Sequence, residues 1–181
     1  TGANVVIPNG GIKMIATDGA GSGATVTDVL DLTGGTGNVG LGSGSLGTSL
    51  TTGTDNVAIG ENAGDALSTG SDNTLVGDNA GGALTTGGNN IAIGSAALDA
   101  EDTGTDSVAI GFNALTAQNN DSTNYNVAIG SSAGAAITSG VQNTLIGGLA
   151  GTSLTTPNQN VAVGHGALDA ETAGARNTAI G

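Results

Sequence analysis

The stretch NVAIGENAGDALSTGSD, residues 56–72, decides the fold, because the next 17 residues, NTLVGDNAGGALTTGGN, repeat it position by position. Its opening pentapeptide, usually asparagine followed by three mostly apolar residues and a glycine, recurs along the chain. The copies end at Gly60, Gly77, Gly94, Gly111, Gly130, Gly147, Gly164 and Gly181, with a degenerate copy at Gly42. The spacings between these glycines are 17 residues, apart from one of 18 and one of 19. Such tandem repetition is typical of a solenoid, in which each coil contacts only its neighbours.

Each 17-residue unit predicts β-structure. The pentapeptide alternates with period 2, so Val57 and Ile59 share one face of a strand and Ala58 lies on the other. The unit is too short for two helices, and its glycine density disfavours even one. The sequence therefore predicts an all-β fold, a parallel β-solenoid of about nine 17-residue rungs over residues 36–181. Each rung would lengthen the rod by about 4.8 Å.

The columns of the repeat have distinct expected roles. We expect the fourth residues of the units to form an aliphatic ladder inside the coil, with the β-branched second residues beside them. That ladder comprises Ile59, Val76, Ile93, Ile110, Ile129, Ile146, Val163 and Ile180. We expect the first residues to stack at a corner, where side-chain amides pair from rung to rung. This asparagine column comprises Asn56, Asn73, Asn90, Asn126, Asn143, Asn160 and Asn177, with Ser107 in one rung.

One large aliphatic residue lies in the second half of every rung from Gly60 to Gly164. It follows the turn glycine by seven residues at Leu67, Leu84, Ile137 and Leu154, and by four residues at Leu98, Leu115 and Leu168. This exchange indicates a packed interior, but a thin one, because alanine and a few leucines bury little apolar area. We therefore expect the rod to self-associate, most simply as a homotrimer around its long axis.

Residues 1–35 lie outside the repeat and form a separate N-terminal unit in our prediction. NVVIPNGGIKMIA, residues 4–16, predicts a β-hairpin turning at Asn9-Gly10. ATDGAGSGAT, residues 16–25, is expected to be a flexible connector, and TVTDVLDL, residues 25–32, a strand or one helical turn. Because the chain stops in the middle of a rung, we expect it to be a segment of a longer protein.

Composition excludes several classes of partner. The chain carries 15 acidic residues against Lys13 and Arg176, a formal net charge of −13, and it has no cysteine. Two basic groups cannot neutralise a phosphate backbone, so we expect no nucleic-acid partner. No apolar run is long enough to span a bilayer, so we expect no membrane partner. Without cysteine there is neither a disulfide framework nor a thiolate metal site.

The sequence contains no arrangement typical of an enzyme. His165 is the only histidine, so it has no histidine or cysteine partner for a metal or catalytic site. The equivalent position of other rungs holds residues as different as Glu61 and Phe112, which indicates an exposed position. The GxGxxG match at residues 42–47 lacks the strand–helix context of a dinucleotide site. We therefore predict no catalytic residue, no metal ligand and no cofactor.

Two alternative binding functions stay open at lower weight. Asp55, Asp72 and Asp106 follow turns, as in calcium-binding β-rolls, but that column later holds uncharged or basic residues, namely Gln142, Gln159 and Arg176. Pairs of Thr or Ser occur once in most rungs and suggest an ice-binding row. Adjacent side chains of a strand cannot face one surface, which argues against that function. These pairs are residues 51–52, 68–69, 85–86, 138–139 and 155–156.

The 19-residue rung is the main irregularity. Its segment TAQNNDSTNYN, residues 116–126, adds two residues and carries the only tyrosine. We consider Asn119, Asn120, Asp121 and Tyr125 a possible surface-contact loop, since loops on a rigid scaffold often bind, for example, a glycan. A bulge without a binding role, or a loop packed in the trimer, is the competing interpretation.

The repeat also has a family resemblance. NVAIG followed by two residues and alanine resembles the head repeats of trimeric autotransporter adhesins, the YadA-like left-handed β-roll. The longer unit NVAIGENAGDALSTGSDNT is similar to the NTAIGxxAL…TTGxxNT repeats of phage tail-fibre-like proteins. The opening GANVVIPNGGIKMIATDGAGSG resembles a segment of marine phage fibres, although Gly11 and Met14 depart from that pattern.

Both resemblances imply a homotrimeric fibre on a virion or cell surface. The expected function is therefore the structural shaft of an extracellular fibre, most simply a phage tail fibre whose tip recognises a host. A host-surface glycan or protein would then be bound through regions outside this chain. The alternative is the head of a bacterial surface adhesin.

Overall fold

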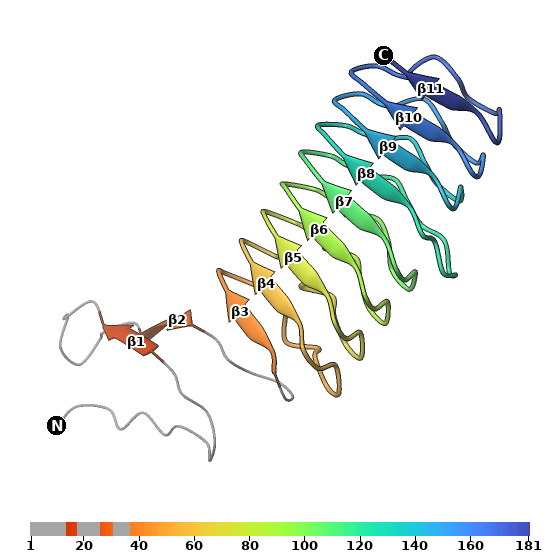
Figure 1. The fold of residues 1–181 in the computed structure, drawn as a ribbon. Helices are drawn as coiled ribbons and strands as arrows, with labels where there is room; N and C mark the ends of the chain where they lie inside the picture. Colours follow the sequence, from red (N-terminus) through yellow and green to blue (C-terminus); the bar gives the residue numbers. More distant parts are fainter. Residues whose placement is uncertain (1–13, 18–25, 31–36) are drawn as a thin grey trace, which may run out of the picture.

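A computed structural model of the chain describes residues 14–17, 26–30 and 37–181. Strands β1 (Met14–Thr17) and β2 (Val26–Leu30) pair antiparallel. The remaining strands form one parallel sheet in sequence order, each in register with the next (Figure 1). They are β3 (Val39–Leu41), β4 (Val57–Ile59), β5 (Thr74–Val76), β6 (Ile91–Ile93), β7 (Val108–Ile110), β8 (Val127–Ile129), β9 (Thr144–Ile146), β10 (Val161–Val163) and β11 (Thr178–Ile180).

The predicted parallel β-solenoid is confirmed for residues 37–181. One coil separates each strand from the next, so the nine strands of the sheet enclose eight complete coils. The coils stack into a rod with all the strands on one side (Figure 1). The described residues contain no helix, and therefore none that could span a membrane.

The N-terminal expectations are met only in part. The turn expected at Asn9-Gly10 lies outside the described residues. Residues 26–30 form a strand, one of the two alternatives expected there. Ala16 and Thr17, expected to begin the connector, instead belong to β1, which pairs with β2.

The predicted orientation of the strands is wrong. Ala58 is fully buried, whereas Ile59 is 38% exposed and Val57 is partly exposed. The same inversion holds for the other isoleucines predicted to lie inside. Ile93, Ile110, Ile129 and Ile146 all lie on the outer side of their strands, with buried residues at the centre. The aliphatic ladder therefore exists, but it covers the outside of the coil.

Space inside the coil explains this inversion. The buried central residues of the strands are small or unbranched at Cβ: Gly40, Ala58, Leu75, Ala92, Ala109, Ala128, Leu145 and Ala162. Most of the remaining interior is filled by one alanine and one leucine or isoleucine per rung, as at Ala63 and Leu67. A second column of isoleucine would overfill so narrow a core, and overpacking destabilises a fold.

The predicted exchange of leucine between two positions is confirmed. Leu67, Leu84, Ile137, Leu154, Leu98 and Leu115 are all fully buried, and Leu168 is partly buried. A Cβ added to Gly64 would lie 2.8 Å from Leu67 Cδ1, so the two positions compete for space in a 17-residue rung. The 18-residue rung 38–55 holds leucine at both, with Leu46 buried and Leu50 partly buried. Where leucine takes the glycine position, it adopts that glycine's left-handed backbone, with φ of 54° at Leu98.

The glycine at the end of each strand is required by both conformation and space. Gly147 has φ of 135°, which disfavours L side chains, and a Cβ there would approach Gly164 O. Its neighbour Gly148 is different, since a Cβ there would meet only His165 Cδ2 at 3.4 Å and Ser131 O at 3.9 Å. These two adjacent glycines provide a matched pair for mutation.

We predict that Gly147→Ala lowers the free energy of unfolding by at least about 1–3 kcal/mol, the typical cost of a residue held in a disfavoured backbone conformation. Gly148→Ala should change it by less than about 0.5 kcal/mol, because the added methyl group meets only ordinary contacts. Urea denaturation of both variants measures the difference. Equal destabilisation would contradict this account of the turn.

Candidate functional site

Most of the exposed large hydrophobic side chains of the described residues lie on the outer face of the sheet. We call the first and third residues of strands β3 to β11 the outer face; they are the second and fourth residues of each repeat. Ile59, Ile93, Ile129 and Ile146 are each 37–38% exposed, and Ile91 and Val161 lie beside them in the second column. Since each strand pairs in register with the next, these side chains form two continuous rows. Extended exposed apolar surfaces are typical of interaction sites.

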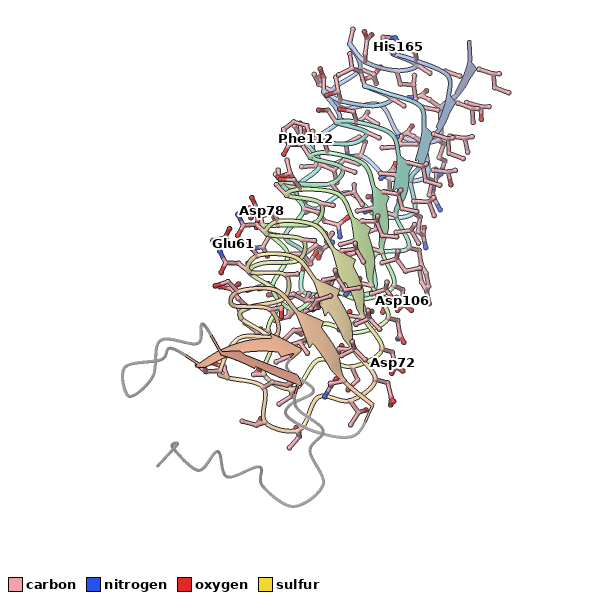
Figure 2. The ribbon with its side chains drawn as sticks, turned by 90° about the vertical axis from the view of Figure 1, so that its left-hand side faces the viewer. Glu61, Asp72, Asp78, Asp106, Phe112 and His165 are labelled. Atoms are coloured by element: carbon pink, nitrogen blue, oxygen red, sulfur yellow. The ribbon has the colours of Figure 1, made fainter. Side chains whose placement is uncertain are left out.

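Two columns of variable residues border the outer face. In Figure 2, Glu61, Asp78, Phe112 and His165 follow one edge of the rod, while Asp72 and Asp106 lie on the opposite edge. His165 is exposed, as predicted. Phe112 and Tyr125, the only aromatic residues of the chain, are 57% and 58% exposed.

The acidic groups are concentrated in the first half of the rod. Ten carboxylates lie between Asp55 and Asp121, and no lysine or arginine lies among them. Burial, followed by the charges of Asp65 and Asp78, raises the pKa of Asp99 above its ordinary value. A Cβ on Gly82 would lie 2.8 Å from Asp99 Oδ1 and 3.7 Å from Asp65 Oδ1, so both carboxylates border the space above this glycine. Like charges therefore face one another along the rod.

The geometry gives no support to the calcium alternative. Asp55, Asp72 and Asp106 lie in one corner column with φ near 60°, and Asn89 separates the second from the third. Within the described ranges, no three His, Cys, Asp or Glu residues form a group that could hold a metal ion. Arg176, in the same column, donates through Nε to Gln159 Oε1 at 2.9 Å.

The Thr and Ser pairs serve mainly to join the rungs. The first hydroxyl of a pair donates to a backbone carbonyl one rung on, as from Ser68 to Thr85 O at 3.1 Å and from Thr85 to Asp102 O at 3.0 Å. The second residue of each pair is exposed, as at Thr69 and Thr86. Because the two residues of a pair differ in this way, they do not form a double row of free hydroxyls.

The asparagine column forms a buried hydrogen-bonded ladder. Asn73 Nδ2 donates to Asn56 Oδ1 at 3.0 Å, and Asn160 Nδ2 donates to Asn143 Oδ1 at 3.1 Å. The amides from Asn38 to Asn143 also donate to a corner carbonyl, as Asn73 does to Gly87 O at 2.9 Å. The ladder thus satisfies polar groups that the turn would otherwise leave buried and unpaired.

Beside the ladder lies a buried polar cluster that sequence reasoning missed. Glu101, Gln118 and Asn124 are fully buried, and we call these three residues the polar layer. Glu101 and Gln118 occupy the position that Leu67 and Leu84 hold in other rungs. The sequence contained a signal, because in these two rungs the leucine moves to the earlier position and a polar residue takes its place.

The predicted surface-contact loop is divided by its contacts. Asn119, Asp121 and Tyr125 are exposed, and Asp121 Oδ1 accepts from Thr103 Oγ1 at 2.6 Å. Asn120 is half-buried, because its Nδ2 donates to Ser139 O at 3.0 Å and its backbone N–H points to Glu101. The loop therefore presents three side chains outward while its backbone supports the polar layer.

Comparison with known proteins adds no functional information: no protein-family model, curated protein or solved structure matches this chain.

The crowded carboxylates predict a pH effect on stability. The pKa of Asp99 is raised in the folded state, so folding takes up protons between the ordinary aspartate pKa of 3.8 and the higher pKa of the folded protein. The free energy of unfolding therefore falls as the pH rises through this range. Asp99→Asn should therefore melt at a higher temperature than the parent at neutral pH and low salt. This advantage should vanish well below the ordinary aspartate value of 3.8.

Melting curves across the acidic range measure this effect. Asp169→Asn is the control, since Asp169 holds the equivalent position in rung 160–176, distant in sequence from Asp65 and Asp78. An advantage of Asp99→Asn that is independent of pH, or one equally large in Asp169→Asn, would show that the charges do not interact as described.

Proposed function

We propose that residues 36–181 form the structural shaft of an extracellular homotrimeric fibre, most simply a phage tail fibre or related virion appendage. The observation that carries this proposal is the outer face. Its two rows run along strands β3 to β11 with no charged residue in either column. One row is aliphatic throughout, and the other is mostly valine with threonine at positions 74, 144 and 178. A second and third copy of the same chain provide the simplest apolar surface of matching length.

Three copies related by rotation about the long axis suit the shape of the rod. Cyclic symmetry closes such an assembly without leaving an open contact. It also orients all chains in parallel, so equivalent rungs lie at one level. Each apolar row then extends along the assembly axis, which is the arrangement a shaft requires to transmit force along its length.

The distribution of polar groups supports a structural role rather than catalysis. The buried asparagine amides are engaged in the ladder, and Glu101 is surrounded by N–H donors. His165 lies exposed at the edge of the rod. Among the described residues, neither Glu101 nor His165 is paired with a nucleophile or a base in the way that enzyme sites require.

The head of a bacterial surface adhesin is the second candidate. It is favoured by the 19-residue rung, where Phe112 and Tyr125 are both exposed near the middle of the rod. Aromatic side chains on a rigid scaffold are common at binding surfaces. In this version, a host-surface glycan or protein would contact the shaft itself through Tyr125 and the exposed residues Asn119 and Asp121.

Light scattering coupled to size exclusion tests the assembly. We expect a mass three times that of the 16.9 kDa chain. The double variant Ile93→Asp/Ile129→Asp should elute as a folded monomer, because it places charges in the middle of the outer face. Leu149→Asp is the control, since Leu149 is 41% exposed but lies outside that face. A monomeric parent protein, or a trimeric double variant, would refute the proposal.

A further inference from the structure

The polar layer interrupts an otherwise apolar column. Leu84 precedes it and Ile137 follows it at the same position of the neighbouring rungs, and both are fully buried. Glu101 belongs to rung 90–106, whereas Gln118 and Asn124 belong to the 19-residue rung, 107–125. A carboxylate buried without a cation is costly unless N–H groups surround it.

Glu101 has such a surrounding, and most of it comes from the following rung. Its own rung supplies only Gly104 N–H, which donates to Oε1 at 2.8 Å. From the 19-residue rung, Gln118 Nε2 and Asn124 Nδ2 donate to Oε2 at 3.0 and 3.1 Å. Asn120 N–H approaches both oxygens at 3.3 and 3.4 Å. Asn120 and Asn124 lie in the segment that carries the two additional residues.

Gln118 also bridges the gap in the asparagine ladder at Ser107. Ser107 stands where other rungs have asparagine, so the column lacks one amide. Gln118 Nε2 donates to Ser107 Oγ at 2.8 Å, and Gln118 Oε1 accepts from Asn126 Nδ2 at 2.8 Å. One side chain thus connects the carboxylate below it to the ladder above it.

We propose that the polar layer fixes the order of the rungs, because rung 90–106 can be followed only by rung 107–125. The strand contacts do not distinguish neighbours, since Ala92, Ala109 and Ala128 are identical and the outer columns are interchangeable. A chain that looped out residues 107–125 would stack rung 126–142 on rung 90–106 with these columns matched. It would, however, place Ile137 against Glu101 and remove three of its donors. Buried polar groups specify register in coiled coils by the same penalty.

Hydrogen exchange followed by mass spectrometry tests the proposal on a variant in which leucine replaces two residues of the polar layer, Glu101 and Gln118. The variant Leu98→Gly/Glu101→Leu/Ser107→Asn/Leu115→Gly/Gln118→Leu copies the arrangement of rung 73–89. We expect it to fold but to give two isotope envelopes for peptides covering residues 107–125, one from molecules that have looped out this rung. The parent, and the control Ile137→Leu/Leu154→Ile, should give one envelope. A single, equally protected envelope in the variant would overturn the proposal.

A single substitution tests the same proposal if the multiple variant does not fold. Glu101→Gln keeps the side-chain volume but sets an amide against the N–H donors of the following rung, so the melting temperature should fall by several degrees. Glu171→Gln is the control, since Glu171 accepts mainly from backbone N–H groups of its own rung, Thr172, Ala173 and Gly174. Equal shifts in the two variants would show that the following rung does not recognise Glu101.

Discussion

The structure depends on one constraint: each residue lies beside its equivalent in the next rung, in a parallel ladder without register shifts between β3 and β11. The residue type at every position therefore has to tolerate a similar residue directly above and below it in the neighbouring rungs. Asparagine does so by amide pairing, threonine by donating to a carbonyl one rung on, and glycine by allowing a close approach of backbones. Carboxylates do so less well: burial, followed by the charges of Asp65 and Asp78, raises the pKa of Asp99.

The same constraint links the narrow core to the apolar exterior. A coil of 17 residues encloses about three apolar side chains per level, such as Ala58, Ala63 and Leu67, so the larger β-branched side chains lie outside. Their stacking produces two long apolar rows instead of scattered exposed residues. The proposed trimeric shaft follows from these rows, because an extended apolar face calls for a partner of equal length and period.

The sequence was sufficient to predict the repeat, the strands, the turn glycines and the exchange of leucine between two positions, since each follows from spacing and backbone preference. It did not predict which side of the strand faces inward, because alternation is identical from either side. Threonine at positions 74, 144 and 178 was the available signal, as a hydroxyl is better placed facing water. The polar layer was missed because its donors come from a neighbouring rung and an irregular loop, whose path no periodicity defines.

Distances between spin labels test the central claim of in-register stacking most directly. The chain has no cysteine, so Glu61→Cys can be paired cleanly with Ser131→Cys or His165→Cys, with labelled chains diluted in unlabelled protein. These residues share one column and are four and six rungs apart, so their backbones should be separated by about 19 and 29 Å at about 4.8 Å per rung. Narrow distributions differing by about 10 Å are the expected result. Broad distributions, or distances that do not increase with the number of rungs, would contradict the account.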